Sequence, residues 1–216
     1  MGALGRVDPA VVPAALHVSD SFKIGRQPEA HAGGMTTTTN KLTQRYLDNA
    51  ALFTDVVGAG GTWSAPSPCE GWTAADVLAH VVDTQRGFLE QRGADLGERP
   101  AGSPEEVWTA HLDAVRNVLA DEDFVTEEYD GYFGRTSVAD TLANFYGFDL
   151  VVHRWDLARA LGRDSAFSEE EMDALETGMA GFGDALYSEG VCKPALEVPV
   201  DAPRQERLLA RMGRRV

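Results

Sequence analysis

The stretch GFDLVVHRWDLARALG, from Gly147 to Gly162, decides how this chain folds. At about 100° per residue, Asp149, His153 and Asp156 fall on the same helical face as several apolar side chains. Much of the remaining circumference is also apolar, through Phe148, Val151, Val152 and Trp155. Such a helix is typical of the centre of a bundle, where carboxylates and imidazoles need compensating partners. The sequence therefore predicts a central helix with polar groups on one face.

The segments on either side of this stretch also have the spacing of helices. Apolar residues recur every three or four positions in five further segments: 40–58, 74–92, 104–119, 168–182 and 203–212. Four helices are preceded by a serine or threonine with an acidic residue three positions later, which is typical of an N-cap: Thr73, Ser103, Ser137 and Ser168. The central helix is expected over about 137–161, and the segment 123–136 as a loop or short hairpin. We predict an all-α fold of four or more helices joined by short links.

Composition excludes two classes of partner. The chain has 216 residues, of which 44% are hydrophobic, enough to bury the core of one domain. Its 34 acidic and 19 basic residues give a formal net charge of −15, which repels phosphate backbones and anionic lipid. No apolar stretch is long enough for a transmembrane helix. Nucleic acid and membranes are therefore not expected partners.

The first part of the chain differs from the rest. Residues 1–34 are punctuated by proline and lack sustained periodicity, and they end just before a second methionine, Met35. We expect a disordered extension or a start assigned too far upstream, so that the folded unit is 35–216. The start lacks the charged n-region of a signal peptide, and two cysteines, Cys69 and Cys192, are too few for a disulfide framework. A cytoplasmic protein with reduced thiols is the expectation.

The strongest candidates for chemistry are Asp149 and His153. Their spacing of four residues places them on adjacent turns of one face, where both side chains can reach one ion. His80, on the predicted helix 74–92, lies at the edge between the apolar and acidic sides of that helix and is a third candidate ligand. A second interpretation is open: Asp149 and His153 form a buried hydrogen-bonded pair without metal, and His80 is a packed or solvent-bonded histidine.

Other residues near these candidates also have competing interpretations. Asp156 either accepts a hydrogen bond from an imidazole N–H behind the ligands or pairs with Arg159 or Arg163. Tyr146, like Asp156, is a candidate for orienting ligands or moving protons.

Three further residues are expected to have structural roles. His111 has polar neighbours and is expected at the surface. Trp72 is expected as a core or staple aromatic rather than a stacking platform. Cys69 is expected as a small buried residue at the entrance to the helix 74–92.

Two strings in this sequence carry a resemblance to a known family: PSPCEGWTAADVLAHVV, Pro66 to Val82, and GFDLVVHRWDLARALG, Gly147 to Gly162. They resemble the paired signatures of the actinobacterial DinB-like metal-binding family, which includes the N-terminal domain of mycothiol-dependent maleylpyruvate isomerase. The closing string APRQERLLARMGR resembles that family's usual C-terminal segment, so the likeness runs from about residue 40 to the end. The resemblance implies a DinB-like four-helix bundle with additional C-terminal helices.

The resemblance also implies a metal site. In that family a histidine of the second helix and a carboxylate-x-x-x-His pair on a later helix hold a divalent ion, commonly zinc, with nickel or iron as alternatives. Carried over by position, the ligands are His80, Asp149 and His153. The isomerase has glutamate where this chain has Asp149, which is one methylene shorter. It also has an additional C-terminal domain, whereas this chain ends at Val216, so maleylpyruvate isomerisation itself is not expected.

The function implied by the resemblance is a metal-dependent transferase or isomerase. Two imidazoles and one carboxylate leave an open face on a divalent ion, as catalytic sites do. In this hypothesis a low-molecular-weight thiol, mycothiol, binds there and attacks a small electrophile. Two alternatives are a non-catalytic metal-binding or stress-associated protein and a metal-dependent hydrolase. Helical bundles of this kind often pair, so a homodimer is a further expectation.

Overall fold

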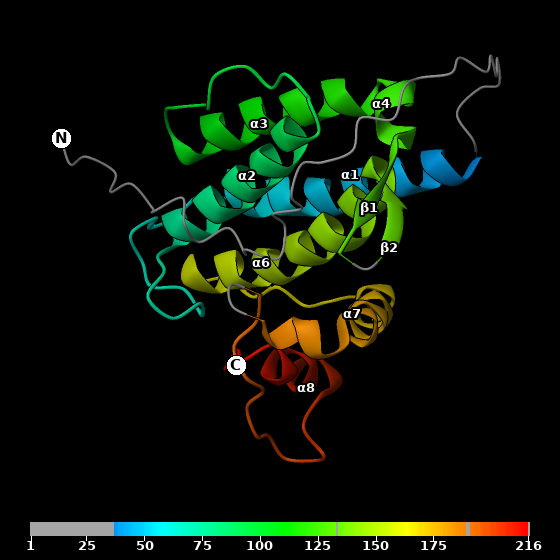
Figure 1. The fold of residues 1–216 in the computed structure, drawn as a ribbon. Coiled ribbons are helices and arrows are strands. Elements are labelled where there is room, and N and C mark those ends of the chain that lie inside the picture. Colours follow the sequence, from blue (N-terminus) through cyan, green and yellow to red (C-terminus); the bar gives the residue numbers. More distant parts are fainter. Residues whose placement is uncertain (1–36, 133, 189–190, 216) are drawn as a thin grey trace.

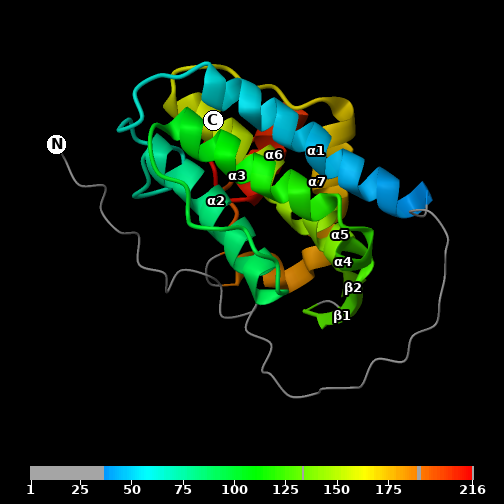
Figure 2. The same ribbon diagram turned by 90° about the horizontal axis from the view of Figure 1, so that it is seen from above.

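Four helices form the core of the protein. The computed structural model describes residues 37–132, 134–188 and 191–215. The four core helices are α1 (Thr37–Gly58), α2 (Ala74–Gln91), α3 (Pro104–Leu119) and α6 (Gly147–Ala160). Both α1 and α2 pack against α3 and against α6, so the four helices surround one apolar core (Figures 1 and 2). The predicted all-α, DinB-like fold is confirmed, with one two-stranded sheet added to it.

Capping side chains begin several helices where the sequence predicts. Thr73 accepts a hydrogen bond from the backbone N–H of Asp76, and the Asp76 carboxylate accepts one from the backbone N–H of Thr73. Ser103 and Ser168 form the same capping box at the starts of α3 and α7 (Glu169–Phe182). These contacts satisfy N–H groups that have no partner inside the helix. The predicted N-terminal ends of α2, α3 and α7 are confirmed.

The segment expected as a loop or short hairpin contains a hairpin and a short helix. Its elements are α4 (Glu122–Thr126), β1 (Glu128–Gly131) and β2 (Gly134–Ser137). The strands pair antiparallel, with Glu128 opposite Ser137, and lie at one end of the bundle beside α4 and α5 (Val138–Thr141) (Figure 2). α4 was not predicted from the sequence, because five residues are too few to show a helical period.

The helix predicted over about 137–161 is one helical run with a wider turn inside it. α5 passes into a π-helical turn, Leu142–Tyr146, and then into α6. The backbone N–H of Gly147 donates to the carbonyl of Leu142, five residues back, and such turns often occur at functional sites. Ten of the 14 residues of α6 are buried, so the helix is central as predicted.

The C-terminal helices cover the side of α6 that faces away from α2 and α3. α7, the 3-10 turn Gly183–Tyr187 and α8 (Arg204–Arg211) lie below α6 in Figure 1. With Val151, Val152 and Trp155 of α6 they enclose a second apolar core. Arg204 joins α8 to α7 through ion pairs with three acids: Glu169, Asp173 and Glu176. α6 is therefore packed on two opposite sides.

Two further expectations concern the first 34 residues and membrane-spanning helices. Residues 1–34, expected as an extension, lie outside the described residues, and the boundary at residue 35 stays a prediction. Within the described ranges, no helix combines the length and apolar character needed to cross a membrane.

Candidate metal centre

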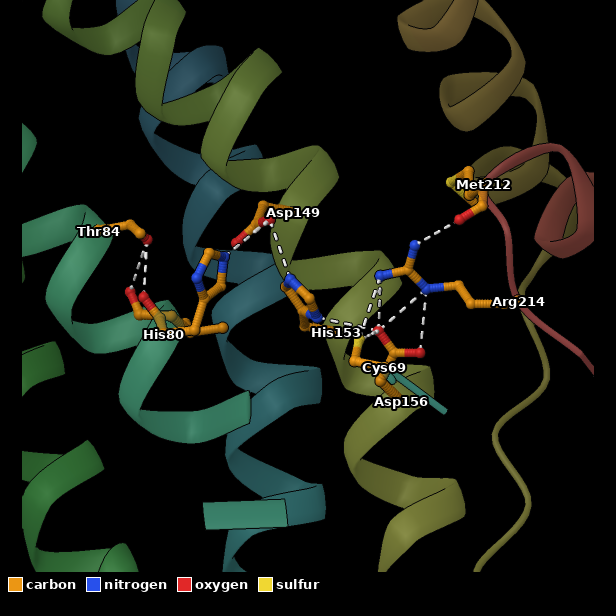
Figure 3. A network of polar contacts seen from close by, with 9 residues as sticks. Cys69, His80, Thr84, Asp149, His153, Asp156, Met212 and Arg214 are labelled. Atoms are coloured by element: carbon orange, nitrogen blue, oxygen red, sulfur yellow. Dashed lines mark hydrogen bonds and ion pairs between the residues drawn. The ribbon is translucent and has the colours of Figure 1, made fainter. Parts of the chain in front are cut away.

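Three polar side chains from two helices converge beside the core. His80 projects from α2, and Asp149 and His153 project from successive turns of α6 (Figure 3). Asp149 Oδ1 lies 3.8 Å from His80 Nε2 and 3.3 Å from His153 Nε2. One donor atom from each residue lies within 4.8 Å of the other two. The structure thus brings together the three residues that the sequence offered as candidate ligands.

These separations suit a single divalent ion. Two ligand atoms about 2.1 Å from a tetrahedral zinc ion are about 3.4 Å apart, close to the measured 3.3 Å and 3.8 Å. Asp149 Oδ2 is buried and has no hydrogen-bond partner among the described residues, a condition that is rare for a buried carboxylate. The side chains of His80 and Asp149 keep 19% and 23% of their surface exposed. The donor set therefore fits a metal ion that remains accessible from outside.

The charges of these groups are strongly coupled. Burial by itself would raise the pKa of Asp149, but the imidazoles of His153 and His80 hold it well below the usual carboxyl range. Burial by itself would lower the pKa of His153, but the carboxylates of Asp149 and Asp156 raise it well above the ordinary value. Without a metal ion, these interactions favour an ionised Asp149 facing a protonated His153. Metal binding would displace a proton from His153 Nε2.

The second ring nitrogen of His153 is held by Asp156. His153 Nδ1 lies 2.9 Å from Asp156 Oδ2, and Asp156 has no exposed surface. When Nδ1 donates to this carboxylate, Nε2 is the nitrogen that faces the other two candidate ligands. One of the two interpretations of Asp156 predicted this contact with an imidazole. Arg159 and Arg163, which the other interpretation offered as partners of Asp156, form their hydrogen bonds with other groups.

Arg214, which was not predicted from the sequence, completes this row of side chains (Figure 3). Its Nε and Nη2 donate to the Asp156 carboxylate over 2.8 to 3.1 Å. α8 ends in a Schellman motif, in which Gly213 has a φ of 77° and the Arg214 N–H donates to the Leu209 carbonyl. This turn directs Arg214 back toward α6. The Gly213-Arg214 pair at the end of APRQERLLARMGR was the sequence signal for this turn. No local pattern indicates which carboxylate Arg214 contacts.

A second group of donor atoms, from Cys69, His153 and Asp156, lies behind the first. The Cys69 thiol donates to Asp156 over 3.2 Å, and Arg214 Nη2 lies 3.6 Å from the Cys69 sulfur. The guanidinium already compensates Asp156 and would repel a cation placed beside it. We therefore regard the group with His80 as the candidate metal site and this group as its support.

Trp72 covers both candidate imidazoles. Its ring centroid lies 4.8 Å from that of His80 and 6.0 Å from that of His153. The connector before α2 turns back on itself: the backbone N–H of Trp72 donates to the Cys69 carbonyl, and Gly71 has a positive φ of 82°. The aromatic ring expected as a core or staple residue therefore packs directly on the site.

Tyr146 lies close to the site but contacts the backbone. Its side chain is buried, and its hydroxyl donates to the carbonyl of Thr84. The Thr84 hydroxyl in turn donates to the carbonyl of His80. The hydroxyl of Tyr146 is thus engaged in holding α2 beside the helical run, rather than in a contact with a candidate ligand.

The expectation that His111 lies at the surface is wrong. His111 has no exposed surface, and its Nε2 is 2.9 Å from Gln85 Oε1, which also accepts a hydrogen bond from the Tyr46 hydroxyl. His111 lies three residues after Trp108 and four before Val115, so it shares the apolar face of α3. That spacing was the signal for burial, and the polar neighbours along the chain obscured it.

Residues 44–158, which contain all three candidate ligands, match a known family model, the mycothiol maleylpyruvate isomerase N-terminal domain. The chain belongs to this family. Two uncharacterized proteins of Mycobacterium tuberculosis, from strains CDC 1551 / Oshkosh and ATCC 25618 / H37Rv, are each 29% identical over 161 residues, which is 70% of this chain and 84% of the relative. No solved structure shows a significant match. The resemblance drawn from the sequence strings is confirmed at the level of the family.

Proposed function

We propose that this protein is a divalent-metal-dependent transferase or isomerase that uses a low-molecular-weight thiol on a small electrophile. The proposal rests on the position of Asp149, whose carboxylate lies between two imidazoles. One oxygen of this carboxylate is buried and has no hydrogen-bond partner in the part of the chain that the structure describes. Zinc is the expected metal, because two imidazoles and one carboxylate form a known ligand set of catalytic zinc sites. Mycothiol is the expected thiol, because the chain belongs to the family of the mycothiol maleylpyruvate isomerase N-terminal domain.

Each residue of the site has a part in this proposal. A divalent ion bound there would lower the pKa of a coordinated thiol, so that the thiol reacts as a thiolate near neutral pH. Asp156 would hold the proton of His153 on Nδ1, which would leave Nε2 free to bind the ion. Arg214 compensates the charge of Asp156. Trp72 shields both imidazoles from water on one side.

Metal content tests the site itself. We expect the purified protein to contain about one equivalent of zinc by elemental emission, and His80→Ala to lose most of it, because one of three ligands is removed. Asp83→Asn is the matched control, since Asp83 lies on the same helix, is half-exposed and pairs with Arg99. A His80→Ala protein with full metal content would refute the assignment of the ligands.

Thiol binding tests the function. Calorimetric titration of the zinc-loaded protein with mycothiol should show binding that is lost in the metal-free protein and with S-methylmycothiol, which has no ionisable thiol. Zinc-loaded protein that does not bind mycothiol would contradict the thiol-dependent reaction. That result would favour the two alternatives, metal-dependent hydrolysis or a non-catalytic metal-binding role, and an assay for ester and amide hydrolysis would separate them.

A further inference from the structure

A cavity of about 790 Å³ lies between the C-terminal end of α2, the β1–β2 hairpin, the π-helical turn and α7. Its volume falls within the range of about 300 to 1,000 Å³ that is usual for small-molecule sites. Among the described residues that line it, none is a candidate metal ligand. The cavity is therefore a separate site from the metal centre.

Aromatic side chains form much of the wall of this cavity. Neighbouring ring centroids are 5.1 to 6.2 Å apart along a continuous series: Tyr129, Phe88, Tyr146, Phe145, Phe182 and Phe148. Ring edges and faces presented at these spacings can pack against another flat apolar group. The wall is thus suited to a ligand with an aromatic or other flat apolar body.

Arg92 provides a cationic group in the same wall. Its guanidinium carbon lies 4.2 Å from the centroid of the Tyr129 ring. In the described part of the chain, its buried Nε has no hydrogen-bond partner and its guanidinium forms no ion pair with a carboxylate. An arginine in this state can donate to a ligand carboxylate.

Within the residues that the structure describes, none of the four acids that line the cavity forms an ion pair with Arg92. Three of the four acids that line it are engaged by other groups: Asp140 by Ser137, Glu171 by Arg154 and Asp173 by Arg204. The ring of Tyr129 holds the guanidinium in place without supplying a negative charge. Arg45, the other arginine that lines the cavity, donates a hydrogen bond to Asn144 Oδ1. The cavity therefore combines an apolar wall with the positive charge of Arg92.

We propose that this cavity binds a small amphipathic carboxylate, with its flat apolar body against the aromatic wall and its carboxylate at Arg92. Such a ligand would cover the half-buried rings of Phe145, Phe148 and Phe182 and would supply a negatively charged partner for Arg92. The proposal goes beyond the metal-dependent function and does not depend on it, because no metal ligand lines the cavity.

The first experiment measures the charge requirement by calorimetry on the full-length, metal-loaded protein. The probes are 2-naphthylacetate and its neutral isostere 2-naphthylacetamide. We expect the carboxylate to bind about tenfold more tightly, since a charge-assisted hydrogen bond adds that much, and Arg92→Gln to remove the difference. Arg116→Gln, which changes an exposed arginine paired with Asp113 on α3, should leave it intact. No binding of 2-naphthylacetate, or an unchanged preference in Arg92→Gln, would overturn the proposal.

The second experiment tests the location. Gly181 of α7 lines the cavity, and a Cβ at this position would meet nothing within 4 Å. Gly181→Leu therefore places a side chain in the open space and suits a helix better than glycine. It should abolish binding of both probes with the circular dichroism spectrum and zinc content unchanged. Retained binding would overturn the proposed location. The proposal would also be overturned if the wild type were a dimer that binds neither probe and Gly181→Leu dissociated it. That result would show that a second copy of the chain occupies the cavity.

Discussion

Replacement of Arg214 by glutamine is expected to lower the free energy of unfolding by about 3 kcal/mol. Asp156 has no exposed surface, and Arg214 donates to both of its oxygens over 2.8 to 3.1 Å. Burial by itself would raise the pKa of Asp156, whereas Arg214 and then His153 hold it below the usual carboxyl range. Arg214→Gln would leave this carboxylate buried without its main partner.

The magnitude follows from the partners that remain. Loss of one member of a buried ion pair typically costs about 3 to 5 kcal/mol. The lower end applies here, because His153 Nδ1 and the Cys69 thiol still contact Asp156, over 2.9 and 3.2 Å. Adding Asp156→Asn to Arg214→Gln removes the buried carboxylate that Arg214→Gln alone would leave without its main partner. The double variant should therefore be more stable than Arg214→Gln alone.

Urea unfolding of the metal-free protein, followed by circular dichroism, measures these differences. The matched control is Arg215→Gln, because Arg215 is the next residue, is exposed and should change stability by less than about 0.5 kcal/mol. The reasoning fails if Arg214→Gln and Arg215→Gln differ by less than about 1 kcal/mol, or if Asp156→Asn gives no recovery in the Arg214→Gln background.

Three further predictions concern the bundle. Burial and nearby arginines lower the pKa of His111 from 6.5 to about 3. Below pH 6.5 the unfolded chain therefore binds a proton at this residue and the folded protein does not, so the free energy of unfolding falls as the pH drops. Between pH 7.5 and pH 5, the free energy of unfolding measured in urea should fall by about 2 kcal/mol more in the wild type than in His111→Gln. Equal decreases in the two proteins would contradict this. Thr73→Ala, which removes a cap, should cost about 1 kcal/mol by the same assay, and a loss equal to that of Thr73→Ser would argue against the cap. Gly178→Ala places a Cβ 2.8 Å from the Phe148 ring and should lower the Tm, whereas Gly181→Ala, with open space around it, should not; equal effects would refute the close contact.

Most of the helices could be predicted because their signals are local. A capping box involves residues three positions apart, and an apolar face repeats every three or four residues, so Thr73 and Ser103 mark the starts of α2 and α3 without knowledge of the rest of the fold. α4 was missed because it is shorter than two helical periods. His111 was misplaced because charged and polar neighbours along the chain outweighed its spacing from apolar residues on α3.

The sequence by itself determined the helical order, the central position of α6 and the pairing of Asp149 with His153, because a four-residue spacing brings two side chains together on any helix. The tertiary structure decided what meets that pair. His80 approaches from another helix, and Arg214 reaches Asp156 across 58 residues of chain. The burial of Asp149 Oδ2 and the aromatic cavity also arise only after the helices have packed, since burial depends on all neighbours at once.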